Sequence, residues 1–63
     1  MVKYRDFISY LTDNGCHLLR QGANHEIWSN GSLQTSVPRH PKINKLTCWA
    51  ICKQLRLKKY PVR

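Results

Sequence analysis

The dipeptide Asn30-Gly31 is the feature that most restricts how this chain can fold. Both residues tolerate the positive φ angles of a tight reverse turn, so the pair predicts a β-hairpin. On one side His25 to Ser29 is typical of a strand, and on the other Leu33 to Val37 alternates between apolar and polar side chains. The middle of the chain is therefore predicted to be β-structure.

A further strand is predicted from Cys16 to Gln21, because this short apolar run is closed by Gly22. The three strands assemble most simply as an antiparallel meander. Strict alternation then places His25 and Ile27 on one face, although Ile27 has the character of a core residue and His25 that of an exposed one. We therefore expect either a bulge near residues 23–26 or an edge position for His25.

Two helices are predicted at the ends of this β-region, each from apolar residues at i, i+3, i+4 and i+7. The first runs from about Lys3 to Asn14 and stops at Asn14-Gly15. The second follows a cap at Asn44. The two apolar stripes are Tyr4, Phe7, Ile8 and Leu11 in the first helix and Cys48, Ile51, Cys52 and Leu55 in the second.

The predicted fold class is therefore α+β, with a three-stranded antiparallel sheet and both helices packed on one face. Residues 38–42 form a basic connector that is too rich in proline for a helix or a central strand. The single domain is expected to cover residues 1–57, followed by a basic C-terminal tail at residues 58–63 to which the sequence assigns no structure, with fraying as one alternative.

Charge points to the class of partner. Eleven Lys and Arg against three Asp and Glu give a net charge of +8, which attracts phosphate backbones. A chain of 63 residues has no room for a deep pocket, so a polymer that brings its own binding surface is the expected ligand. Nucleic acid is favoured over the alternative of an acidic protein partner.

The three cysteines are an odd number, and no apolar segment of about 20 residues accompanies them. We expect a cytoplasmic protein with buried free thiols, no membrane segment and no metal or other cofactor. A zinc site can be written from Cys16, His17, Cys48 and Cys52, but it lacks the Cys-x-x-Cys spacing of such sites.

His25 is the best candidate for chemistry, since it follows a glycine-containing turn close to Arg20 and Gln21. Cleavage of RNA suits one histidine among cations, because the 2′-hydroxyl of the substrate is the nucleophile and needs only a base. Histidine, with an unperturbed pKa of about 6.5, can accept that proton, and nearby cations can stabilise the phosphate. Composition alone also fits an RNA-binding domain without catalysis.

Three groups of residues, in this order along the chain, resemble the HicA family of toxin endoribonucleases. They are Arg20 to Trp28, then Val37-Pro38 with His40, then Thr47 to Leu57. The resemblance covers residues 1–57. It implies a dsRBD-like fold, cleavage of mRNA by a metal-independent mRNA interferase toxin, and neutralisation by a HicB-like antitoxin that covers the active surface.

The resemblance also implies that His25 is the catalytic histidine, here as general base. Arg20, Arg39, His40 and Lys42 are our candidates for phosphate contacts. The chain departs from the family at two glycine positions, which carry Ala23 and Arg56. We expect Ala23 to be the departure that matters, because it precedes His25, and Arg56 to extend the last helix. A non-catalytic RNA-binding module with the same fold is the alternative.

Overall fold

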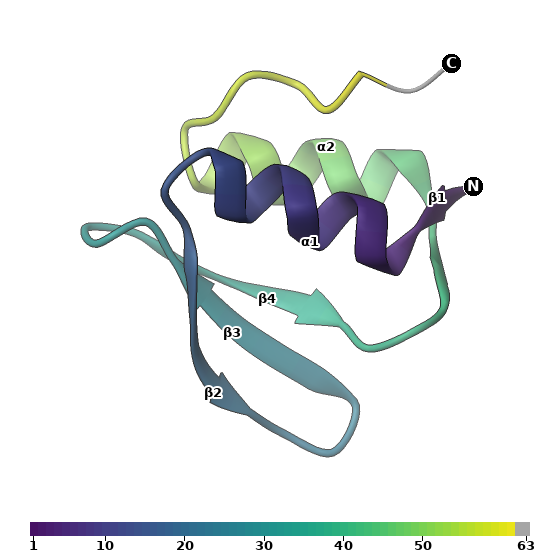
Figure 1. Cartoon of the computed structure of the whole chain (residues 1–63), viewed down its shortest axis with the longest axis horizontal. Helices are drawn as coiled ribbons and strands as arrows, with labels where there is room; N and C mark the ends of the chain where they lie inside the picture. The colour runs from purple at the N-terminus through teal and green to yellow at the C-terminus, as the bar shows by residue number, and fades with distance from the viewer. Residues whose placement is uncertain (62–63) are drawn as a thin grey trace.

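The computed structural model describes residues 1–61 and confirms the predicted α+β fold, with the α-β-β-β-α order of a dsRBD-like domain. Both helices lie on the same face of the three-stranded sheet (Figure 1). No helix within the described residues is long and apolar enough to cross a membrane. The elements are β1 (Val2–Lys3), α1 (Tyr4–Asp13), β2 (His17–Gln21), β3 (His25–Ser29), β4 (Gln34–Pro38), β5 (Lys42–Ile43) and α2 (Lys45–Gln54).

The sheet has the order β2-β3-β4 with antiparallel pairing throughout, so β3 is the central strand. A shift of register interrupts the β2–β3 ladder between Leu18 and Arg20. The prediction missed a second, smaller pairing, in which β5 at the end of the proline-rich connector pairs with β1 at the start of the chain. This pairing ties the connector to the N-terminus of α1.

The hairpin between β3 and β4 is confirmed, but only one of its two predicted residues acts as expected. Gly31 has a φ of 101°, whereas Asn30 does not adopt a positive φ. Instead the Asn30 side-chain oxygen accepts hydrogen bonds from the backbone N–H groups of Ser32, at 3.0 Å, and Leu33, at 2.8 Å. Asn30 therefore shapes a longer loop through its side chain.

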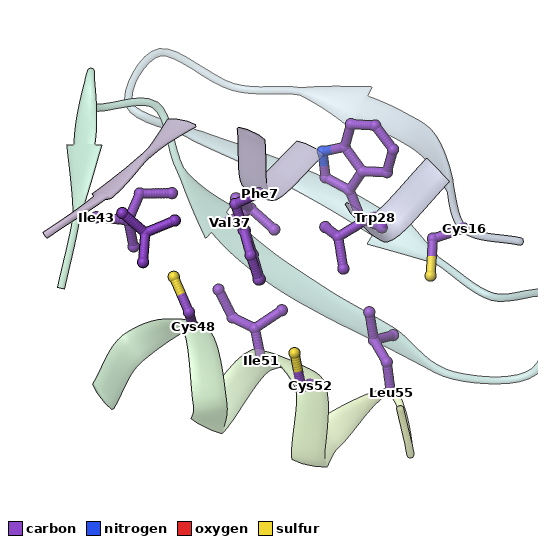
Figure 2. Packing of buried hydrophobic residues seen from close by; sticks show 11 residues of the cluster. Phe7, Cys16, Trp28, Val37, Ile43, Cys48, Ile51, Cys52 and Leu55 are labelled. Carbon is purple, nitrogen blue, oxygen red and sulfur yellow. The ribbon is translucent and has the colours of Figure 1, made fainter. Parts of the chain in front are cut away.

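The core lies between the helices and the sheet, and both predicted helical stripes supply it (Figure 2). Phe7 and Leu11 from α1 and Ile51 from α2 are buried. The three cysteines are free and buried, as predicted for Cys48 and Cys52, and burial raises the pKa of the Cys48 thiol to about 11. Asn44 caps α2 as predicted, because its side chain accepts a hydrogen bond from the Leu46 N–H at 2.7 Å.

The end of α2 contradicts the expectation that Arg56 extends the helix. Arg56 has a φ of 56°, and the helix ends at Gln54. The N–H of Leu57 donates to the carbonyl of Cys52 at 2.8 Å and the N–H of Arg56 to that of Lys53 at 3.1 Å. These two bonds form a Schellman motif, in which the left-handed position is usually glycine.

The start of the C-terminal tail is packed rather than frayed. The Tyr60 ring lies edge-on to Phe7 and Tyr10, with centroid distances of 5.5 Å and 5.1 Å. The Trp49 indole N–H donates to the Tyr60 carbonyl at 3.0 Å. Tyr60 therefore extends the core, while the last residues of the predicted tail, Val62 and Arg63, lie outside the described residues.

Candidate functional site

His25 is the first residue of β3, and its side chain is exposed. It pairs with Pro38 on β4, and no shift of register interrupts the β3–β4 ladder. No bulge is present near residues 23–26, and His25 lies exposed at the end of its strand, which is the second of the two expected arrangements. The expectation that Ile27 is a core residue is wrong, because Ile27 is only half-buried and shares with His25 the face of the sheet that the helices leave open.

Arg20 lies on the same open face. It pairs with Ile27 across the β2–β3 ladder, which makes it the diagonal neighbour of His25. A shallow hollow of about 260 Å³ occupies this part of the face, lined by Leu19, Arg20, Ile27 and Gln34. The predicted base and one predicted cation are thus next to a surface that is partly apolar.

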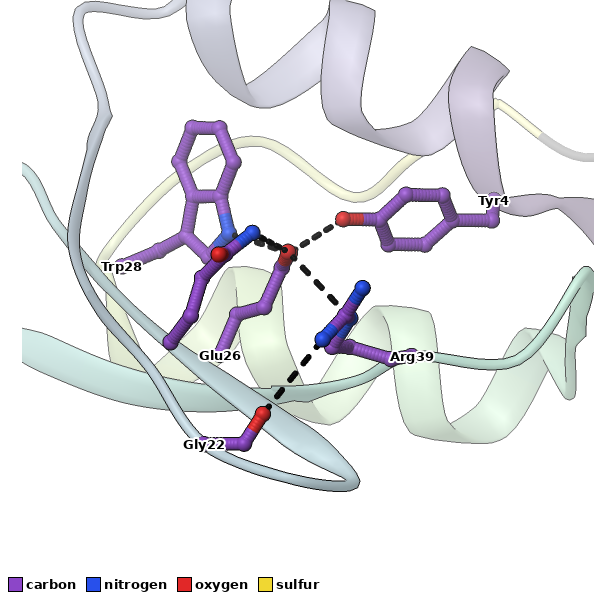
Figure 3. Close-up of polar contacts among 6 residues, drawn as sticks. Tyr4, Gly22, Glu26, Trp28 and Arg39 are labelled. Carbon is purple, nitrogen blue, oxygen red and sulfur yellow. Dashed lines mark hydrogen bonds and ion pairs between the residues drawn. The ribbon is translucent and has the colours of Figure 1, made fainter.

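The opposite side of β3 carries a buried carboxylate, Glu26, which is only 3% exposed (Figure 3). Its Oε1 accepts hydrogen bonds from the Tyr4 hydroxyl and, at 3.1 Å, from the Trp28 indole N–H. Its Oε2 accepts from the Gln21 amide at 3.2 Å and lies 3.7 Å from Nε of Arg39. Three hydrogen-bond donors and one cation therefore meet at this carboxylate.

These contacts keep Glu26 ionised. Burial alone would raise the pKa of its carboxyl, but the hydrogen bonds from Tyr4, Trp28 and Gln21, with the nearby charge of Arg39, outweigh burial and lower it. Burial and the same hydrogen bond raise the pKa of the Tyr4 hydroxyl to about 12, so this group remains a donor at neutral pH. In this charged cluster both oxygens of the buried carboxylate have partners.

Arg39 joins this network to the turn that precedes His25. Its Nη1 donates to the carbonyl of Gly22 at 3.5 Å, and its backbone N–H donates to the carbonyl of Asn24 at 2.9 Å. The N–H of Gly22 in turn donates to the carbonyl of His25 at 2.7 Å. The Arg39 side chain is 44% exposed, so part of its guanidinium still faces solvent.

The remaining predicted cations lie on the connector after β4. His40 and Lys42 are both exposed. Lys42 lines an open groove of about 400 Å³ together with Lys3, Tyr4, Arg5 and Pro41. The groove is held together by a hydrogen bond of 2.9 Å from the N–H of Tyr4 to the carbonyl of Pro41. Tyr4 lines this groove and also donates a hydrogen bond to Glu26, next to His25. The connector and the turn before His25 therefore lie at the same end of the molecule.

The residues that prediction missed are Glu26 and Tyr4. A signal for Glu26 was present, since alternation places it on the same face as Trp28. No comparable signal links Tyr4 to Glu26, because 22 positions separate them along the chain. The alternative zinc set is not assembled: within residues 1–61, no three His, Cys, Asp or Glu side chains are grouped to hold a metal ion.

Comparison with known protein families decides the family. The model described as HicA toxin of bacterial toxin-antitoxin matches residues 4–57, which include both helices and the whole sheet. The chain belongs to the HicA toxin family. Membership implies a toxin role and an antitoxin partner for this HicA-family chain. Separate comparisons with curated proteins and with solved structures found no match.

Proposed function

We propose that this HicA-family chain is a metal-independent endoribonuclease, an mRNA interferase in which His25 is the general base. His25 accepts the proton of a 2′-hydroxyl while the 2′-oxygen attacks the neighbouring phosphorus. The bond from phosphorus to the 5′-oxygen of the next nucleotide breaks, and that oxygen leaves with a proton from the histidinium or from water. The products carry a 2′,3′-cyclic phosphate and a 5′-hydroxyl.

The observation that carries this proposal is the position of His25 on the open face of a basic domain. The face is free of helices, so a large substrate has access to the imidazole. Arg20 is its diagonal neighbour across the ladder and can bring positive charge to the phosphate as charge develops. A base and a cation on one accessible face are the minimum that this chemistry needs.

The phosphate backbone of the RNA is proposed to continue from His25 along the connector. His40 and Lys42 are exposed there, and Lys3 and Arg5 extend the positive charge into the groove beside Lys42. Arg39 uses part of its guanidinium on Glu26 and Gly22 and retains further N–H donors for a phosphate. Binding by such contacts weakens as salt concentration rises.

The proposed setting is a bacterial cytoplasm, with mRNA as substrate, no cofactor, and a HicB-like antitoxin as the protein partner. The antitoxin would neutralise the toxin by covering the His25 face. This part of the proposal rests on family membership and on the accessibility of that face.

The test is cleavage of an mRNA fragment in excess chelator by the wild type, His25→Ala and His17→Ala. His17 is a matched control, because it is another exposed strand histidine at the start of β2. We expect H25A to lose about 100-fold or more in rate and H17A to keep the wild-type rate. Undiminished cleavage by H25A, with its fold verified by circular dichroism, would remove His25 from the mechanism.

The groove of Lys3, Arg5 and Lys42 favours one second candidate, an RNA-binding module without catalysis. Its cations line a concave surface of their own, and no histidine lines it. Such a module would bind structured RNA with a steep salt dependence and leave it intact. A denaturing gel of RNA after incubation with saturating protein separates the two functions, since only the nuclease shortens the RNA.

A further inference from the structure

The buried carboxylate of Glu26 has no part in the chemistry proposed for His25, yet it is the most heavily contacted polar side chain near it. Its hydrogen-bond donors come from α1 (Tyr4), β2 (Gln21) and β3 (Trp28), and its ion-pair partner, Arg39, comes from the connector. A buried charge costs free energy unless it is fully paired. A cluster that joins four segments in this way fixes their relative positions.

The four segments carry the candidate site. The chain turns at residues 22–24 and enters β3 at His25, one residue before Glu26. Arg39 contacts both ends of that turn, because its side chain donates to the Gly22 carbonyl and its backbone N–H donates to the Asn24 carbonyl. The Arg39 side chain is oriented by its ion pair with Glu26. Arg39 is also followed directly by His40 on the connector. The pairing of Glu26 with Arg39 therefore adds a side-chain link to the backbone hydrogen bonds that place His25 next to the connector.

We propose that Glu26, Tyr4 and Arg39 form a positioning brace that holds the His25 turn and the connector in the arrangement needed to act on RNA. The proposal rests on the ribonuclease function proposed above. Glu26 is a positioning residue because it lies on the helix side of the sheet and acts through Arg39. A small displacement of a reacting group is enough to slow an enzyme strongly, by about 100-fold for 1 Å.

The brace is tested with Glu26→Gln, which keeps the size of the side chain and removes its charge. Asp13→Asn is the matched control, since it makes the same change in net charge at an exposed site, at the opposite end of α1 from Tyr4. Amide hydrogen exchange by NMR measures how often the hydrogen bonds of the turn open, through the exchange rates of the Gly22 and Arg39 N–H groups. The N–H of Asn30, bonded to Leu33 in the far hairpin, is the internal reference.

In E26Q we expect the Gly22 and Arg39 amides to exchange about tenfold faster than in the wild type, while Asn30 changes by less than about twofold. In RNA cleavage we expect kcat to fall about tenfold or more with KM nearly unchanged. D13N should match the wild type in both measurements. Tyr4→Phe removes a single donor, so it should move both readouts in the same direction by a smaller factor, and it replaces E26Q if that variant does not fold.

The outcomes separate this inference from the proposed function. If the wild type leaves RNA intact, the ribonuclease assignment fails, and the exchange measurement still decides whether the brace orders the turn. Unchanged exchange at Gly22 and Arg39 in E26Q would overturn the brace. Faster exchange without a fall in kcat would overturn its positioning role, and so would a D13N variant that loses activity to the same extent.

Discussion

At two positions where the resemblance predicts glycine, the chain carries Ala23, in the turn before β3, and Arg56, after α2, and the two positions differ in backbone conformation. Among residues 1–61, Arg56 is the only non-glycine residue with a positive φ. Ala23 therefore sits in a conformation open to any residue, whereas Arg56 occupies the left-handed region that favours glycine. The backbone conformation therefore favours glycine at position 56 and not at position 23.

The two segments are also held by different forces. The turn at residues 22–24 is held by backbone hydrogen bonds and also by a side chain from elsewhere in the chain, because Arg39, which is paired with Glu26, donates to the Gly22 carbonyl. The end of α2 depends on its own backbone, through the two bonds of the Schellman motif. Substitutions at Glu26 should consequently disturb the turn most. Substitutions that change the preferred backbone conformation should have their main effect at position 56.

The largest expected effect comes from removing the carboxylate with Glu26→Ala. This leaves the Tyr4 hydroxyl and the Trp28 indole N–H without their acceptor and Arg39 without its partner, so we expect a loss of about 3 kcal/mol in the free energy of unfolding. Ile27→Ala is the matched variant on the open face, where half-burial limits the expected loss to about 1 kcal/mol. Urea unfolding of both variants measures the difference.

Equal losses in free energy of unfolding for Glu26→Ala and Ile27→Ala would contradict this expectation. They would mean that Ile27 behaves as the core residue its sequence suggests, or that the polar contacts of Glu26 contribute little to stability. The slope of free energy against urea concentration must match the wild type in both variants for the two losses to be compared.

A smaller effect is expected from pH. The pKa of Glu26 is lowered from its ordinary value of 4.5 in the folded chain, chiefly because hydrogen bonds from Tyr4, Trp28 and Gln21 overcome the opposing effect of burial. Its stabilising contribution is therefore fully present above about pH 4.5 and is lost as pH falls through the lower, folded-state value.

Glu26→Gln does not titrate, so the difference in free energy of unfolding between wild type and E26Q should be constant near neutral pH and shrink below pH 4.5. Urea unfolding at a series of pH values measures it. A difference that stays constant down to the acid limit would show that Glu26 has the same pKa in the folded and unfolded chain.

The parts of the fold that sequence could predict are those with a clear period. The stripe that includes Phe7 and Leu11 identified α1, and the alternation through Thr35 and Val37 identified the faces of β4. Strands β1 and β5 have two residues each, which is too short for any period, and their pairing joins positions about 40 residues apart. Such pairings depend on tertiary contacts.

The candidate site was predictable only in its exposed part. His25 was found because histidine after a turn suggests chemistry, whereas Glu26 was missed because an isolated carboxylate in a strand is ordinarily solvated. Its burial depends on Tyr4 and Arg39, which come from distant parts of the sequence. Strict alternation does put Glu26 on the same face of the strand as Trp28, but taking Ile27 for a core residue left the face of His25 unresolved.

The glycine comparison itself is tested by restoring glycine at position 56. Arg56→Gly should raise the free energy of unfolding by about 1 kcal/mol, because relief of the left-handed strain exceeds the added entropy of the unfolded chain. Urea unfolding measures the gain. The variant leaves the Schellman bonds of Leu57 and Arg56 in place, since both are made by backbone groups. A loss of stability would show that the Arg56 side chain itself contributes more than its strained backbone costs.

Ala23→Gly introduces glycine at the other position where the resemblance predicts it, and its effect on the free energy of unfolding should have the opposite sign. Because Ala23 has no positive φ, glycine there relieves no strain and only adds freedom to the unfolded chain, at a cost of about 0.5 kcal/mol. The double variant should equal the sum of the two single effects, since the turn and the end of α2 share no hydrogen bond within residues 1–61. A stabilising A23G would mean that the turn before His25 is strained with alanine and needs the backbone freedom of glycine. The contacts of Arg39 would then hold the turn in a strained conformation.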